Sequence, residues 1–76
     1  MIITVYTSDN CMACKMTKDL LDREGIPYTV KNISENDAYR AEVEQLGFSR
    51  VPVTVGKTVV SGFDPEALKT LKGEKG

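Results

Sequence analysis

The chain carries two cysteines, Cys11 and Cys14, at the point where an apolar segment gives way to an amphipathic one. Residues 2–7 (IITVYT) are largely β-branched and apolar on both faces, which is typical of a buried strand. Residues 12–24 (MACKMTKDLLDRE) show the apolar spacing of a helix. The sequence therefore predicts that the cysteine pair lies at a strand-to-helix junction, and this placement limits both the fold and the chemistry.

The helix predicted at residues 12–24 has one apolar face. We expect this face to turn four side chains toward the core, those of Ala13, Met16, Leu20 and Leu21. Gly25 follows as a C-terminal stop. Residues 28–33 (YTVKNI) are predicted to form a second strand. A strand, a helix and a strand in this order make a βαβ unit with parallel strands.

Two further helices are predicted from capping residues and apolar spacing. Residues 34–47 (SENDAYRAEVEQLG) favour a helix that Ser34 or Asn36 can cap. Residues 64–72 (DPEALKTLK) favour a short helix with Asp64 as its N-cap and a proline at its first position. Both segments are bounded by turn residues, so we expect two separate helices.

Between these helices lies a predicted hairpin. Residues 51–55 (VPVTV) and 58–62 (TVVSG) are short strands, and the glycine of Gly56–Lys57 suits a two-residue type II′ turn. The resulting order is β-α-β-α-β-β-α, an α/β fold with a four-stranded mixed sheet flanked by three helices. We expect one thioredoxin-like domain over residues 1–76 with a frayed tail at 73–76, because a C-x-x-C in a βαβ pattern is the redox motif of that fold.

Composition excludes several classes of function. The chain has 76 residues and a formal net charge of −1, from ten basic and eleven acidic side chains. It has no basic patch for nucleic acid and no segment that could serve as a signal peptide or cross a membrane. We therefore expect a cytoplasmic protein, and cysteines there are kept reduced unless a disulfide is transient or catalytic.

The position of the cysteines predicts their roles. Helix N-termini present unpaired N–H groups and a positive potential, and both stabilise a thiolate. Cys11, at the mouth of the helix, is expected to be the exposed nucleophile, and Cys14, one turn further in, the buried resolving thiol. Two cysteines without histidine cannot complete a zinc site within one chain, so we expect no metal. A dimer that shares an iron–sulfur cluster or a metal remains a non-enzymatic alternative.

Two later segments are candidates for binding substrate. Pro52 can take the cis form, which would leave the backbone N–H and C=O of Val51 free to pair with an extended substrate beside the nucleophile. Gly62 permits a close backbone approach. Phe63 is expected in the core, and its alternative role is to lie exposed at the surface and bind a substrate or partner. Asp64 is expected to cap the last helix, whose unpaired N–H groups could also hold a carboxylate.

The chain resembles the glutaredoxin family, and within it most of all the hydrogen donors of ribonucleotide reductase called NrdH-redoxins. The matching pieces are ITVYT, CMAC, GF-RVPV and SGF-P, which together span most of the chain. The resemblance implies a thioredoxin fold, Cys11 as nucleophile, Cys14 as resolving thiol and Pro52 in cis. It implies a redox-active Cys11–Cys14 disulfide as the only redox group, electrons from thioredoxin reductase, and a ribonucleotide reductase or another protein disulfide as acceptor. We expect a monomer.

The sequence departs from both branches of the family. Glutathione-dependent glutaredoxins usually carry a lysine or arginine where this chain has Ser8, and often a tyrosine where it has Met12 and Ala13. We expect Met12 and Ala13 to form an apolar docking surface for a protein partner. The hydrogen donors commonly have a tryptophan where this chain has Val60. Asp64 matches an aspartate that glutaredoxins use for glutathione, so a glutathione-dependent glutaredoxin is the alternative function.

Overall fold

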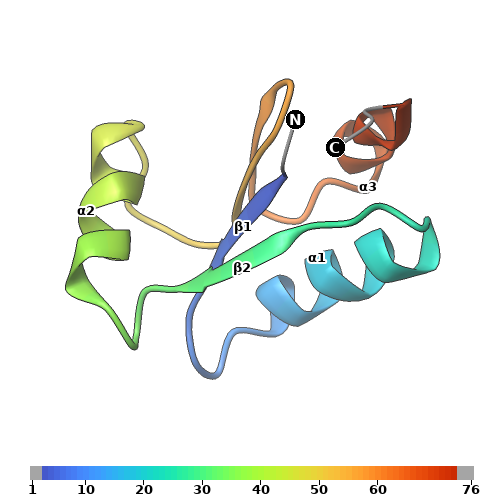
Figure 1. Ribbon diagram of the computed structural model, residues 1–76. Helices are drawn as coiled ribbons and strands as arrows, with labels where there is room; N and C mark the ends of the chain where they lie inside the picture. The colour runs from blue at the N-terminus through green and yellow to red at the C-terminus, as the bar shows by residue number, and fades with distance from the viewer. Residues whose placement is uncertain (1–2, 74–76) are drawn as a thin grey trace.

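A computed structural model describes residues 3–73 of the chain and shows one mixed sheet with helices on both faces (Figure 1). The elements in chain order are β1 (Thr4–Thr7), α1 (Met12–Arg23), β2 (Thr29–Asn32), α2 (Asp37–Gln45), β3 (Val53–Val55), β4 (Val59–Ser61), α3 (Pro65–Lys69) and a closing 3-10 turn, η1 (Thr70–Gly73). The predicted order of elements and the thioredoxin-like layout are confirmed.

The sheet has the strand order β2-β1-β3-β4. β1 runs parallel to β2, with Thr7 opposite Asn32, and antiparallel to β3, which pairs antiparallel with β4. Because parallel strands end at the same edge of a sheet, the loop that leaves β1 toward α1 lies next to the segment that follows β2. This edge carries the cysteine pair.

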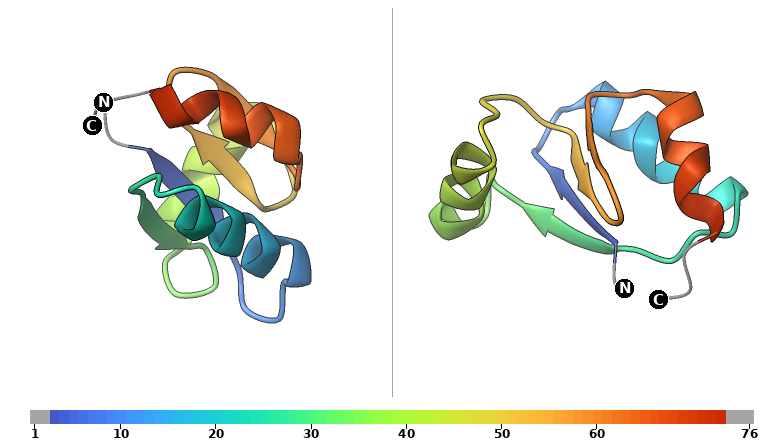
Figure 2. Two further views of the ribbon diagram at one scale, coloured as in Figure 1. Left: turned by 90° about the vertical axis from the view of Figure 1, so that its right-hand side faces the viewer. Right: turned by 90° about the horizontal axis from the view of Figure 1, so that it is seen from above.

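Two apolar cores hold the helices on the sheet. α1 and α3 cover one face and α2 covers the other, which gives three layers (Figure 2). The larger core, on the α1 and α3 side, consists of Ile3, Val5, Leu20, Leu21, Ile26, Val60, Leu68 and Leu71. The smaller core, on the α2 side, consists of Tyr6, Ile33, Val43 and Val53. α1 is therefore fixed by the main core of the molecule, and its N-terminus has a rigid support.

The helix α1 differs from the prediction at two neighbouring positions. Met16 was expected to face the core but is 43% exposed, whereas Thr17 is fully buried. The Thr17 hydroxyl donates to the Ala13 carbonyl over 2.9 Å, so this polar side chain is buried with its donor satisfied. Leu20 and Leu21 are buried as predicted, so only the first half of α1 departs from the apolar pattern, with Cys14 and Thr17 buried in place of Met16.

The hairpin turn is also longer than predicted. Val55 pairs with Val59, so three residues connect the strands, and Gly56 does not have the positive φ that a type II′ turn requires. A two-residue turn would shift the register by one position and turn Val60 out of the core. Val60 is 5% exposed and lies opposite the buried Thr54, so burial of this pair accounts for the longer turn.

Element ends differ from the expected ranges by at most three residues. β1 begins at Thr4, with Ile3 buried beside it, and α2 begins at Asp37 with Asn36 as its N-cap. Gly73 lies in the 3-10 turn, and the rest of the predicted frayed tail, 74–76, falls outside the described residues. Among residues 3–73, no helix has the length and apolar character needed to cross a membrane.

Candidate functional site

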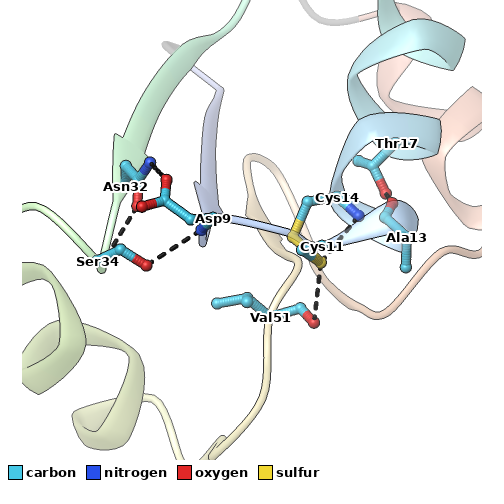
Figure 3. The surroundings of a disulfide bond; sticks show 8 residues. All are labelled: Asp9, Cys11, Ala13, Cys14, Thr17, Asn32, Ser34 and Val51. Atoms are coloured by element: carbon cyan, nitrogen blue, oxygen red, sulfur yellow. Dashed lines mark hydrogen bonds between the residues drawn. A yellow bond between two sulfur atoms is a disulfide. The ribbon is translucent and has the colours of Figure 1, made fainter.

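The two cysteines form a disulfide at the first turn of α1 (Figure 3). Cys11 is the N-cap of the helix, and its Sγ atom accepts a hydrogen bond from the backbone N–H of Cys14 over 3.1 Å. Their Cα atoms are 5.2 Å apart. Cys11 is half-buried, whereas Cys14 is only 1% exposed. The two sulfur atoms therefore differ in access, with Cys11 on the outside.

The backbone that precedes β3 lies against this disulfide. The carbonyl oxygen of Val51 is 4.0 Å from the Sγ atom of Cys11, and the Val51–Pro52 peptide bond is cis, as the resemblance implied. Pro52 is buried, and Val51 is half-buried. The structure thus brings Val51 and Pro52 to Cys11, although they are about forty residues apart in the chain.

Beside the disulfide lies a pocket of about 630 Å³. It is lined by Thr7, Ser8, Asp9, Asn10, Cys11, Met12, Cys14, Lys15, Lys18 and Asn32. Met12 is 70% exposed at its rim, and Ala13 behind it is half-buried. Lys15 is paired with Asp19 over 3.1 Å. Lys18 is half-buried and supplies a second positive charge on the α1 wall. The pocket is open to solvent, and its lining includes charged, polar and apolar side chains.

The third predicted segment lies next to Pro52. Gly62 adopts a positive φ of 77°, and its N–H donates to the Pro52 carbonyl over 2.8 Å, so this glycine supports the loop before β3. Phe63 packs against the larger core, as expected. Asp64 is the N-cap of α3, and its carboxylate accepts a hydrogen bond from the N–H of Ala67 over 3.2 Å. Phe63 and Asp64 therefore have structural contacts that account for their positions.

A polar network at the end of β2 was not predicted from the sequence. The side-chain amide of Asn32 donates to the carboxylate of Asp9 over 3.0 Å, and the hydroxyl of Ser34 accepts from the Asp9 N–H over 3.1 Å. The Ser34 N–H in turn donates to the Asn32 side chain over 2.8 Å. The strand topology could have indicated this network, because residues that follow neighbouring parallel strands meet at one edge of the sheet.

A separate charged cluster lies on the α2 side of the sheet. The hydroxyl of Tyr6 donates to Glu42 over 2.6 Å, and the ammonium group of Lys31 donates to the same carboxylate oxygen over 2.9 Å. These hydrogen bonds lower the pKa of Glu42, and the bond from Tyr6 has the larger effect. The cluster links β1, β2 and α2, so its role is to hold α2 on the sheet.

Within residues 3–73, no three His, Cys, Asp or Glu side chains are placed to hold a metal ion together. The two cysteine sulfurs are bonded to each other. A bonded pair of sulfurs supports the formation and cleavage of a disulfide, with Cys11 the more accessible sulfur and Cys14 the protected one.

Comparison with known proteins places this geometry in a family. The family model described as Glutaredoxin matches residues 3–60. The chain belongs to the glutaredoxin family. The glutaredoxin-like protein NrdH of Lactococcus lactis subsp. cremoris (strain MG1363) is 38% identical over 71 residues, which cover 92% of this chain and 99% of the relative. The glutaredoxin-like protein NrdH of Escherichia coli (strain K12) is 29% identical over 72 residues, with 93% and 89% covered.

Solved structures agree with this glutaredoxin assignment. The NrdH-redoxin of Escherichia coli superimposes with a TM-score of 0.87 at 29% identity and covers 93% of this chain and 95% of its own. The glutaredoxin of Archaeoglobus fulgidus gives a TM-score of 0.78 at 30% identity, with 95% and 86% covered. This glutaredoxin is thus similar to NrdH-type redoxins over nearly its whole length, and it is a thiol–disulfide oxidoreductase with a C-x-x-C disulfide.

Proposed function

We propose that this glutaredoxin is a dithiol electron donor in which Cys11 attacks a substrate disulfide and Cys14 releases the product. The observation that carries the proposal is the placement of Cys11 as the half-exposed N-cap of α1, with its sulfur accepting the Cys14 N–H. This N–H group and the helix dipole stabilise a thiolate at Cys11. Cys14 is buried, so it reacts with a partner that is already bound to Cys11.

The reaction moves two electrons to the substrate. The Cys11 thiolate attacks one substrate sulfur and forms a mixed disulfide, and the other substrate sulfur leaves as a thiolate and takes up a proton. Cys14 then loses its proton and attacks the Cys11 sulfur. The Cys11–Cys14 bond forms, and the second substrate sulfur leaves and is protonated. The substrate ends as two thiols, and the donor ends as the disulfide.

Substrate contacts are proposed on the two sides of the disulfide. On one side the Val51 carbonyl lies 4.0 Å from the reactive sulfur, which suits pairing with an extended substrate backbone. On the other side Met12 and Ala13 offer an apolar surface next to Cys11. Gly62, through its hydrogen bond to Pro52, keeps this part of the site in place.

The proposed electron source is thioredoxin reductase, and the proposed acceptor is a protein disulfide such as that of a ribonucleotide reductase. Ser8 lines the pocket at the position where glutathione-dependent relatives carry a cation. Loss of one charge-assisted hydrogen bond to a glutathione carboxylate costs about 1.5–3 kcal/mol, or roughly ten- to a hundredfold in affinity. The similar Escherichia coli NrdH-redoxin is described as having a thioredoxin-like activity profile. A reducing cytoplasm fits a disulfide that forms only during turnover.

Glutathione-dependent reduction is the second candidate, and one observation favours it. Lys18 lines the same pocket and could hold a carboxylate in place of the missing cation at Ser8. Asp64 is less informative, because its role as N-cap of α3 explains its position. If glutathione is the reductant, Lys18→Gln should slow reduction by glutathione and leave reduction by thioredoxin reductase unchanged.

NADPH oxidation distinguishes the two candidates. The oxidised protein is supplied as substrate either to thioredoxin reductase or to glutathione with glutathione reductase, and Cys11→Ser serves as the inactive control. The proposal expects the faster turnover with thioredoxin reductase. Faster turnover with glutathione would establish the second candidate instead. Strong visible absorption by the purified protein would point to the third possibility, a shared iron–sulfur cluster.

A further inference from the structure

The loop of residues 8–10, which precedes Cys11, is held by hydrogen bonds of Asp9. Residues 8–10 connect β1 to the N-cap, and Asn10 among them has a positive φ of 57°. Among the described residues, both hydrogen bonds that this loop makes involve Asp9, one through its carboxylate to Asn32 and one through its N–H to Ser34. The partners lie 23 and 25 residues further along the chain. The loop therefore depends on the end of β2 for its position.

The three side chains form a connected network. Asn32 uses both ends of its amide, because the nitrogen donates to Asp9 at 3.0 Å and the oxygen accepts from the Ser34 N–H at 2.8 Å. Figure 3 shows the three residues turned toward one another beside the disulfide. Asn32 sits at the end of a strand that is paired with β1, so its own backbone is held by the sheet. The sheet therefore fixes the position of Asn32, and the loop is attached to Asn32 through Asp9.

The network also lies at the reactive centre. Two of its three residues, Asp9 and Asn32, line the pocket that both cysteines share. A displacement of the loop would move Cys11, the residue that must stay over the first N–H groups of α1 for its thiolate to be stabilised. The hydrogen bond from Cys14 to the sulfur spans 3.1 Å, which leaves little room for displacement.

We propose that Asn32, with Ser34, is a positioning residue that sets the reactivity of Cys11 by fixing the loop through Asp9. The inference deepens the proposed function and rests on Cys11 as the nucleophile. Asn32 acts through the loop and does not touch the reacting sulfurs. Its removal should leave the fold in place, since the cores on both faces of the sheet do not include it.

The test uses the reduced full chain and a limiting thiol-alkylating agent, with the rate followed against pH and the labelled cysteine identified by peptide mapping. Asn32→Ala, which changes no charge, should slow alkylation of Cys11 at neutral pH by about two- to tenfold, the range expected for one ordinary hydrogen bond. It should also raise the midpoint of the pH–rate curve. Ser34→Ala, a milder change, should act in the same direction.

The matched control is Asn36→Ala. Asn36 caps α2 by accepting the Ala38 N–H over 2.9 Å, so its loss weakens the fold without touching the loop. This variant should alkylate like the wild type. Equal shifts in Asn32→Ala and Asn36→Ala would show a general effect of stability and would overturn the inference.

A reciprocal exchange provides a rescue. Asn32→Asp keeps the oxygen that accepts the Ser34 N–H but faces the Asp9 carboxylate without a donor, so Cys11 should react more slowly. Adding Asp9→Asn restores the donor–acceptor pair in reverse and returns the carboxylate count to that of the wild type, so reactivity should recover. No recovery, or wild-type behaviour of Asn32→Ala, contradicts the inference. Labelling of Cys14 first in the wild type would instead refute the proposed function, and with it this inference.

Discussion

The backbone N–H of Cys14 donates a hydrogen bond to the sulfur of Cys11 across 3.1 Å, within the first turn of α1. The donor belongs to the residue whose own thiol is buried, and the acceptor belongs to the residue that caps the helix. One turn of helix therefore makes two chemically identical side chains unequal. Access and thiolate stabilisation both favour Cys11, and the proposed division of roles follows from this inequality.

The first prediction concerns the cation that glutathione would use. Ser8→Lys should raise the rate of reduction by glutathione about tenfold, since a lysine in this pocket can form a charge-assisted hydrogen bond with a carboxylate. The rate with thioredoxin reductase should stay nearly unchanged. Thr58→Lys, in the hairpin turn at the far end of β3, adds the same charge away from the pocket and should have no effect on either rate. The readout is NADPH oxidation in both systems.

The second prediction separates the structural role of Asp64 from ligand binding. Asp64→Ala removes the N-cap of α3 and should lower the free energy of unfolding by about 1 kcal/mol. Asp64→Asn keeps a capping oxygen, so its stability in urea should stay close to that of the wild type. If Asp64 only caps the helix, the asparagine variant should also keep its rate with glutathione. A selective loss of that rate in the asparagine variant would assign Asp64 to glutathione.

The third prediction compares two fully buried threonines. The Thr54 hydroxyl has no hydrogen-bond partner among the described residues, whereas the Thr17 hydroxyl donates to Ala13. Thr54→Val should therefore raise the free energy of unfolding, by about 1 kcal/mol, because an unpaired buried polar group is costly. Thr17→Val should lower it by about 0.5–1.5 kcal/mol. Equal effects of the two substitutions in urea denaturation would contradict the assignment.

The fourth prediction concerns acid stability. The pKa of Glu42 is lowered from its ordinary value of 4.5, first by the hydrogen bond from Tyr6 and then by that from Lys31. A lowered pKa in the folded state means that the contact stabilises the fold above the unfolded pKa and is lost as pH falls through the folded value. The difference in unfolding free energy between the wild type and Glu42→Gln should therefore shrink as pH drops below about 4.5. Parallel pH profiles for the two proteins would be inconsistent with this pKa shift.

Much of the fold could be predicted because its signals are local. Apolar period, capping residues and the C-x-x-C motif gave the order of elements, and the N-caps Asn36 and Asp64 were found where expected. The predicted burial of Met16 was wrong. It rested on the apolar character of the side chain, whereas the structure buries Thr17, whose hydroxyl donates to the Ala13 carbonyl. The predicted two-residue length of the hairpin turn was also wrong. The register of β3 and β4 depends on which residue of β4 is buried in the core, and the turn residues alone do not show this.

The part of the site that is marked by local sequence motifs could also be predicted. Both cysteines, Val51 and Pro52 were identified from motif and resemblance, and the structure brings them together. The network of Asp9 and Asn32 was missed because its partners are far apart in the chain. Polar residues after strands are common in loops, so only the pairing of β1 with β2 reveals that these two meet.

In the proposed function Cys11 attacks the substrate disulfide and Cys14 resolves the mixed disulfide. The most direct measurement incubates reduced Cys14→Ser and reduced Cys11→Ser with a protein disulfide substrate and separates the products by non-reducing electrophoresis. We expect Cys14→Ser to accumulate a mixed disulfide through Cys11, because no second thiol releases it. We expect Cys11→Ser to form none, because its remaining thiol is 1% exposed. A mixed disulfide that accumulates in Cys11→Ser and not in Cys14→Ser would show that Cys14 is the nucleophile and Cys11 the resolving thiol.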